Sequence, residues 1–264
     1  MNNMYFLTKD MADKYIEQNG VQLRNKVYRL DDKIIKIIDD EKSQSILYNR
    51  FSRDELLQFK DIEIDSFSFA RALVYTGLFN KYAVINEYVN GYSLDRKHLC
   101  DYPIDVVITA VDKIFYDISK ITDKYICVND IHFGNMIFDG NKITMIDTTE
   151  YCYVYGHDDL YEYNIRMIMD MLFQNIFFNE SISFMRLVCN VRNVHRYFSL
   201  KNSEYANFRE LEYLLSPVET LTEMKKFIEE DFGIKLNTFA ECHKYIDAFV
   251  KENTISNKGL VLKK

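Results

Sequence analysis

From Cys127 to Glu150 the chain reads CVNDIHFGNMIFDGNKITMIDTTE, and two short apolar runs stand out in this stretch. The runs at 136–138 and 143–146 flank Asp139-Gly140, a pair that strongly favours a β-hairpin. Asn135 enters the first predicted strand, and Asp147 leaves the second. Because a hairpin brings its two ends together, we expect the side chains of Asn135 and Asp147 to converge. An ordinary surface hairpin with polar ends is the alternative.

A third polar residue, Asp130, precedes Asn135 in the spacing D-x-x-x-x-N. Carboxylate and amide oxygens are the ligands that Mg²⁺ prefers, and a further carboxylate can accept a proton from a hydroxyl group. Together with Asp147, the pattern resembles the catalytic core of the protein-kinase-like superfamily. With His132 included, the form D-x-H-x-x-N is closest to bacterial small-molecule phosphotransferases of the aminoglycoside- and choline-kinase-like group.

This resemblance implies a role for each residue and names ATP and Mg²⁺ as cofactors. Asp130 would orient the acceptor hydroxyl and take its proton. Asn135 and Asp147 would hold magnesium. We interpret His132 as a structural residue that bonds the backbone, in preference to an acid or base.

A second hairpin is predicted near the start of the chain, where residues 27–30 and 33–38 flank Asp31-Asp32. Lys36 lies inside the apolar second strand, and the resemblance makes it the lysine that contacts the α and β phosphates. Lys33, at the turn, is the alternative. The resemblance also assigns Glu55, on a predicted helix over 42–60, as the partner of Lys36. Glu41 is the runner-up, and Glu55 could equally be an exposed helix glutamate.

Two more strands are predicted at about 68–76 and 82–89, and the second ends in Glu87-Tyr88-Val89. This end resembles the hinge between kinase lobes, where the backbone binds adenine. The resemblance places Ser93 or Asp95 near the ribose. A plain strand that ends in a turn explains the same pattern without a ligand.

The sequence departs from the family pattern in three places. No G-x-G-x-x-G occurs at 20–26, where a glycine-rich phosphate cover belongs. Val128-Asn129 replaces the usual His-Gly. The segment after Asp147 is short, with Asp158 and Asp159 opening a predicted helix over 160–178, and one of these aspartates is expected to brace the catalytic loop. The short segment favours a small-molecule acceptor over protein Ser/Thr, although both remain open. A pseudokinase that binds nucleotide without turnover is the main alternative, and a helical interaction protein with a chance motif is a third.

Helices are predicted for most of the remaining chain. Residues 103–121 form a clear amphipathic pattern, with Asp101 as a possible cap. Capping boxes at 216–219 and 238–241 open two later helices. The sequence therefore predicts an α+β, bilobal, kinase-like fold. It has a small β-rich N-lobe with one helix at 1–89 and a larger, mainly helical C-lobe at 90–264.

Composition limits the possible partners. The net charge of −7 over 264 residues makes nucleic acid an improbable partner, because phosphate backbones bind basic faces. No window has the roughly 18 apolar residues that a membrane span requires. The five scattered cysteines lack zinc-site spacing, so we expect reduced thiols in a cytoplasmic protein.

Overall fold

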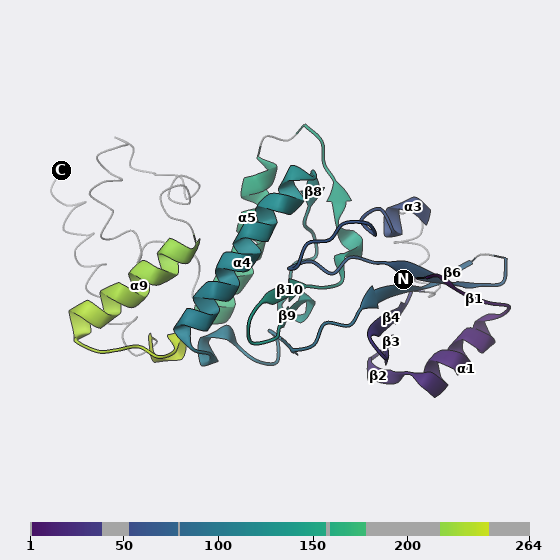
Figure 1. Cartoon of the computed structure of the whole chain (residues 1–264), viewed down its shortest axis with the longest axis horizontal. Helices are drawn as coiled ribbons and strands as arrows, with labels where there is room; N and C mark the ends of the chain where they lie inside the picture. Colours follow the sequence, from purple (N-terminus) through teal and green to yellow (C-terminus); the bar gives the residue numbers. More distant parts are fainter. Residues whose placement is uncertain (1, 39–52, 79, 157–158, 178–216, 243–264) are drawn as a thin grey trace, which may run out of the picture.

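The computed structural model describes residues 2–38, 53–78, 80–156, 159–177 and 217–242 (Figure 1). The fold mixes α and β structure and is compatible with the α+β class. A β-sheet carrying helix α1 lies at one end of the molecule, and helices α4, α5 and α9 follow toward the other (Figure 1). No helix in these ranges is both long enough and apolar enough to cross a bilayer.

Six strands form the main sheet in the order β1-β5-β6-β4-β3-β2. Their bounds are β1 Met4–Phe6, β2 Val21–Arg24, β3 Val27–Leu30, β4 Lys33–Ile37, β5 Ala72–Thr76 and β6 Asn80–Glu87. The predicted β3–β4 hairpin is confirmed, with Leu30 opposite Lys33 and the turn residue Asp31 at a φ of 51°. Strands β1 and β2 were not predicted, and β5 begins four residues later than expected.

Two helices accompany this sheet, not the single one expected. Helix α1 (Lys9–Asn19) begins after Thr8, whose hydroxyl caps it by accepting a hydrogen bond from the Met11 N–H. Its buried residues Ala12 and Ile16 pack against the sheet. Helix α3 covers only Arg53–Leu56, and turns follow over 57–61, so the end of the helix expected at 42–60 is wrong. The first part of that helix lies outside the described residues.

Helices dominate the remainder of the described chain. Their bounds are α4 Ile104–Asp123, α5 Leu160–Phe177 and α9 Pro217–Phe232, with 3₁₀ turns η2 Leu99–Asp101 and η5 Phe239–Cys242. The apolar stripe of α4 is buried as expected: Val107, Val111, Ile114, Ile118 and Ile121. The expected cap is wrong. Pro103 stands at the N-cap position of α4 without a side-chain bond, and the Ile104 N–H donates to the Asn237 carbonyl instead.

The predicted central hairpin is confirmed as β9 (Met136–Phe138) paired with β10 (Ile143–Met145). The Asp139 carboxylate closes its turn by accepting from the Asn141 and Lys142 N–H groups. Strand β7 (Tyr92–Ser93) adds to the β9 edge. A separate two-stranded ribbon joins β8 (Ile126–Cys127) to β11 (Cys152–Tyr153). These small sheets lie between the main sheet and the helices (Figure 1).

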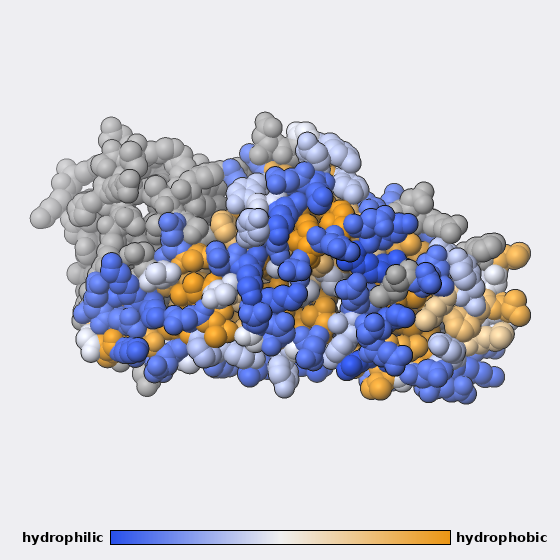
Figure 2. Space-filling model, viewed as in Figure 1, coloured by the Kyte–Doolittle hydropathy of each residue, from blue (hydrophilic) through white to orange (hydrophobic). Residues whose placement is uncertain are grey.

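One surface of the molecule exposes apolar side chains at the far end of the main sheet. Figure 2 shows hydrophobic residues gathered there, while hydrophilic ones cover most of the remaining visible face. Tyr5, Leu7 and Leu78 are 58%, 79% and 92% exposed. This end lies away from the central hairpin, so it does not contribute to the candidate site.

The chain passes from the sheet to the helices through a close backbone contact at Gly91. Its φ is +137°, and a Cβ there would lie 2.5 Å from the Phe138 oxygen and 2.8 Å from the Phe138 carbonyl carbon. Only glycine meets both demands, because the obstructing atoms belong to the backbone of β9. Gly91 thus allows β7 to pair with the hairpin.

We predict that Gly91→Ala destabilises the protein by roughly 3 kcal/mol, combining backbone strain with a clash. Gly140→Ala is the matched control, since Gly140 also has a positive φ (+95°) but nothing within 4 Å of an added Cβ. It should cost about 1 kcal/mol from strain alone. Urea unfolding of both variants measures the difference, and equal losses would show that the contact at Gly91 is not restrictive.

Candidate active site

A cavity of about 480 Å³ opens between the face of the main sheet and the β9–β10 hairpin. The sheet contributes Val27, Ile34, Lys36, Val84, Asn86 and Glu87 to its wall, and β2 with the turn after it contributes Leu23, Arg24 and Asn25. The crossing segment contributes Tyr88, Val89 and Ser93, and the hairpin region contributes Gly134, Ile137, Ile146 and Asp147. The cavity therefore collects residues that are far apart in the sequence.

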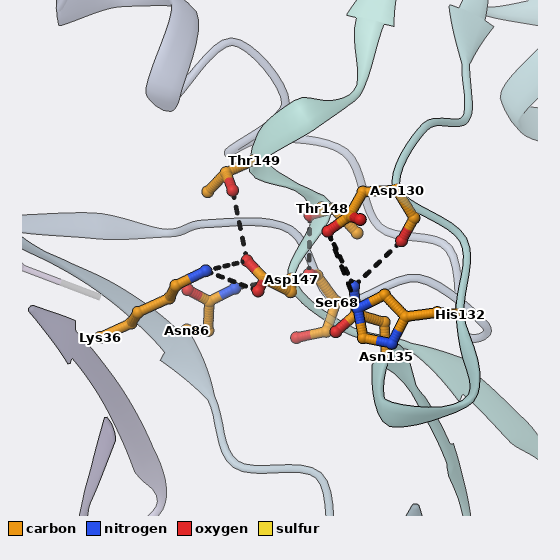
Figure 3. Close-up of polar contacts among 9 residues, drawn as sticks. All are labelled: Lys36, Ser68, Asn86, Asp130, His132, Asn135, Asp147, Thr148 and Thr149. Carbon is orange, nitrogen blue, oxygen red and sulfur yellow. Dashed lines mark hydrogen bonds and ion pairs between the residues drawn. The ribbon is translucent and has the colours of Figure 1, made fainter. Parts of the chain in front are cut away.

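Lys36 and Asp147, which both line this cavity, form an ion pair (Figure 3). The Lys36 Nζ lies 2.6 Å from Oδ1 and 2.5 Å from Oδ2 of Asp147. Lys36 faces the cavity because strand alternation places it on the same side as Ile34, with Val84 as its cross-strand partner. Asp147 has a left-handed backbone (φ 57°), and the Thr149 hydroxyl also donates to its Oδ1 at 3.2 Å. The Asp147 carboxylate is thus held from two sides.

Asp130 and Asn135 form the second polar pair of the site (Figure 3). Asn135 is 2% exposed, and its Nδ2 donates to the Asp130 backbone oxygen (3.0 Å) and to Oδ2 (3.2 Å). The Ile146 N–H donates to the Asn135 carbonyl at 2.8 Å, which places Asn135 beside the strand end that carries Asp147. The backbone pairing therefore brings Asn135 and the residue before Asp147 together at the open end of the hairpin, as the sequence predicts.

His132 hydrogen-bonds the backbone, as we expect of a structural residue. Its Nδ1 accepts from the Gly134 N–H at 3.1 Å, which caps the 3₁₀ turn η3 (Phe133–Asn135). Its Nε2 lies 3.8 Å from Asp130 Oδ2, at the limit of an ion pair. His132 therefore shapes the loop that presents Asp130.

The donor set at the hairpin fits magnesium. The Asn135 amide nitrogen is committed to Asp130, so the amide can offer only its oxygen to a cation, and Asp147 adds carboxylate oxygens. Within the described ranges no group of three His, Cys, Asp or Glu residues could hold a metal. Two protein oxygens are sufficient where phosphates and water complete the shell, as is usual for Mg²⁺.

The expected pairing of Lys36 with Glu55 is wrong. Both hydrogen bonds of Lys36 go to Asp147, and Glu55, on α3, does not line the cavity. The alternative partner Glu41 lies outside the described residues. Lys36 pairs with Asp147 because β4 and the end of β10 face each other across the cavity. The Asp147 carboxylate therefore lies within reach of the Lys36 ammonium group.

The residues predicted at the hinge and ribose positions all line the cavity. These are Glu87, Tyr88, Val89 and Ser93, together with Asp95. The Tyr88 N–H donates to the Asp32 carbonyl at 2.8 Å, which fixes the end of β6 against the β3–β4 turn. The Ser93 hydroxyl donates to the Asp95 carboxylate.

The place expected for a glycine-rich cover is occupied by β2 and its turn. Leu23, Arg24 and Asn25 line the cavity there, so side chains stand where glycines would present backbone N–H groups. Arg24 is one of three cationic residues that line the cavity, together with Lys36 and Arg96. The sequence predicts that this segment lacks the glycine-rich motif, but it does not predict strand β2.

Asn164 of α5 braces the loop that precedes Asp130, and the sequence pattern does not predict this role. Its side chain is 0% exposed, and Oδ1 accepts from the Val128 N–H at 3.0 Å. Its Nδ2 donates to the Ile126 carbonyl (2.8 Å) and to the Thr122 hydroxyl (3.0 Å). The expected brace was Asp158, which is outside the described residues, or Asp159, whose backbone oxygen accepts from Tyr163 in the first turn of α5. A signal was present: Asn164 lies four residues before the buried Ile168, on the apolar stripe.

The Val128-Asn129 pair has its own support in the structure. Val128 is 0% exposed, and the Asn129 Nδ2 donates to the Glu150 carbonyl at 3.0 Å. The bond ties the loop before Asp130 to the 3₁₀ turn η4 (Thr148–Glu150) after Asp147. An apolar side chain and an amide thus replace the contacts of the usual His-Gly.

Tyr151 lies buried behind the two carboxylates. Burial, with smaller contributions from the negative charges of Asp130 and Asp147, raises the pKa of its phenol. Its hydroxyl has no hydrogen-bond partner among the described residues. Tyr151 therefore stays neutral at physiological pH and does not add charge to the site.

We predict that Asn164→Leu destabilises the protein by about 3 kcal/mol, because the Val128 N–H and the Ile126 carbonyl lose their partners in a buried place. Asn90→Leu is the control, since Asn90 is exposed and outside the cavity wall. Urea unfolding would report the loss. Stability equal to that of the control would show that Asn164 is not a brace.

No protein-family model matches this chain, and no curated protein is similar to it in sequence.

Proposed function

We propose that the protein is an ATP- and Mg²⁺-dependent phosphotransferase of the bilobal kinase-like type, which moves the γ-phosphate to a hydroxyl acceptor. Its N-lobe would be residues 1–89 and its C-lobe residues 90–264. One observation carries the proposal: a single cavity is lined both by aliphatic side chains and by the Lys36–Asp147 pair, and Asp130 and Asn135 lie near Asp147 (Figure 3).

The aliphatic side chains that line the cavity suit a purine ring. Val27 and Val84 on the sheet side and Ile137 and Ile146 on the hairpin side provide apolar walls for a flat ring. The backbone at 87–89 runs along the same cavity and offers N–H and C=O groups. In this proposal adenine binds there, and Ser93 and Asp95 lie near the ribose.

The cationic side chains that line the cavity suit a chain of phosphates. Lys36 would donate to phosphate oxygens, and Arg24 of the cover would add a second positive charge. Asn135 and Asp147 would hold magnesium, which would offset the negative charge of the phosphates. Lys36 offsets the charge of the Asp147 carboxylate and keeps it oriented toward the cavity.

Asp130 is placed to orient the acceptor. Its side chain is 50% exposed, so a hydroxyl group can reach it from solvent, while the Asn135 amide fixes one carboxylate oxygen. The carboxylate would take the hydroxyl proton as the acceptor oxygen bonds to the γ-phosphorus, while the bond from that phosphorus to the β-phosphate oxygen breaks and ADP leaves. The segment after Asp147 is held by β11 pairing with β8, which leaves little chain for docking a peptide and favours a small-molecule acceptor over protein Ser/Thr.

A second candidate function is a pseudokinase, a nucleotide-binding or regulatory module without turnover. The observation that favours it is the cover: β2 and its turn contain no glycine, and side chains fill the place of phosphate-binding N–H groups. The retention of Lys36, Asp130, Asn135 and Asp147 together favours the enzyme. In both candidates the protein binds ATP, acts in the cytoplasm and has no need of nucleic acid.

We predict that Mg²⁺-ATP at about 100 times its Kd stabilises the protein by about 2.7 kcal/mol, and that Asp147→Asn removes most of this gain because a metal ligand loses its charge. Thermal melting with ATP and Mg²⁺, separately and together, measures both effects. Asp112→Asn, on the exposed face of α4, is the matched control and should behave as wild type.

Turnover is tested by following ATP consumption with pools of hydroxyl-bearing small molecules and of proteins. Asp130→Asn should keep the thermal shift and lower turnover by about 10²-fold or more, because the proton acceptor is lost. Binding without consumption in any pool would favour the pseudokinase. The absence of any shift with Mg²⁺-ATP would rule out both candidates.

A further inference from the structure

Asn86 is the feature of the cavity that the proposed function leaves without a role. We infer that Asn86 selects adenine over guanine, its side-chain oxygen accepting a hydrogen bond from the amino group at position 6 of the base. The inference rests on the proposed function, because it requires a purine nucleotide in this cavity.

The position of Asn86 puts an amide against the place of the base. It lies on β6 one residue before Glu87, opposite Ile34 of β4, and alternation turns it to the same side as Val84. Asn86, Ile34 and Val84 all line the cavity, and Ile137 and Ile146 face them from the hairpin side. A buried amide oxygen without a donor is costly, so a donor group on a ligand in the cavity is a natural partner for the oxygen of Asn86.

The orientation of the amide follows from its hydrogen bond to the backbone at Ser68. The Asn86 Nδ2 donates to the Ser68 carbonyl at 3.5 Å, a long contact. That carbonyl can only accept, and it already accepts from the Thr148 hydroxyl at 3.0 Å (Figure 3). The nitrogen therefore faces Ser68, and the oxygen is directed elsewhere. No described residue donates to this oxygen, so it remains an acceptor for a ligand in the cavity.

An acceptor at this point discriminates between the two purines. Adenine carries an amino donor at position 6, whereas guanine carries a carbonyl oxygen there. Two oxygens facing each other leave both without a partner and repel. The backbone at 87–89 also offers donors and acceptors to the base, and the Asn86 oxygen would add one further acceptor to the discrimination that they provide. Asn86 is thus the side chain that would bias the site toward ATP.

The test measures the affinities of ATP, GTP and purine riboside triphosphate, which lacks any group at position 6, each with Mg²⁺. Wild-type protein should bind ATP about tenfold more tightly than purine riboside triphosphate, corresponding to one hydrogen bond to the base. GTP should bind more weakly than either, because it adds a facing oxygen. Isothermal titration calorimetry gives all three constants and needs no variant.

Asn86→Leu completes a thermodynamic cycle, with Asn90→Leu as the matched control outside the cavity. The leucine side chain has the branched shape of asparagine but cannot accept a hydrogen bond. The preference for ATP over purine riboside triphosphate should therefore fall about tenfold in Asn86→Leu, while the control keeps the wild-type preference. A wild-type protein that binds the three nucleotides equally, or an Asn86→Leu protein that keeps the preference, would overturn the inference and leave the proposed function intact. Absence of binding by all three would overturn both.

Discussion

The ion pair between Lys36 and Asp147 joins the two parts of the site, and most of the architecture serves to place it. The partners are 111 residues apart in the chain and remain 38% and 20% exposed. A pair this accessible adds little to stability, since solvent screens it and ordering two side chains has a cost. Its importance lies in position. β4 must lie between β3 and β6 for Lys36 to face the cavity, and β10 must end in a left-handed residue for Asp147 to meet it.

The loops around this pair are held mainly by neutral amides. On α5, Asn164 binds the backbone at 126 and 128, and Asn175 binds the Leu99 N–H (2.7 Å) and the Leu94 carbonyl (2.8 Å). The two asparagines are 11 residues apart, about three helical turns, and therefore lie on the same face. An amide satisfies both a donor and an acceptor and brings no charge. The helix can thus hold both segments without perturbing the carboxylates of Asp130 and Asp147.

Local patterns predicted the elements that form by local rules. The β9–β10 hairpin has a turn pair between apolar runs, and α4 has an uninterrupted stripe, so both were predicted from a few residues. Strand β1 was missed because three residues show no clear alternation, and it forms only by pairing with β5. Strand β2 was missed because all four of its residues are exposed. The partner of Lys36 was misassigned because pairing across the cavity depends on how two distant strands face each other, which no local spacing reveals.

The segment at 64–68 fastens the main sheet to the helices at a second point, besides the crossing near Gly91. The Met145 N–H donates to the Ser66 carbonyl and the Ser68 N–H to the Met145 carbonyl, and the Ser66 N–H donates to Asp117 of α4. The Thr148 hydroxyl adds a bond to the Ser68 carbonyl, so this segment touches both strand β10 and the turn that follows Asp147. A displacement of the helices relative to the sheet would therefore also shift the residues that carry the Asp147 carboxylate.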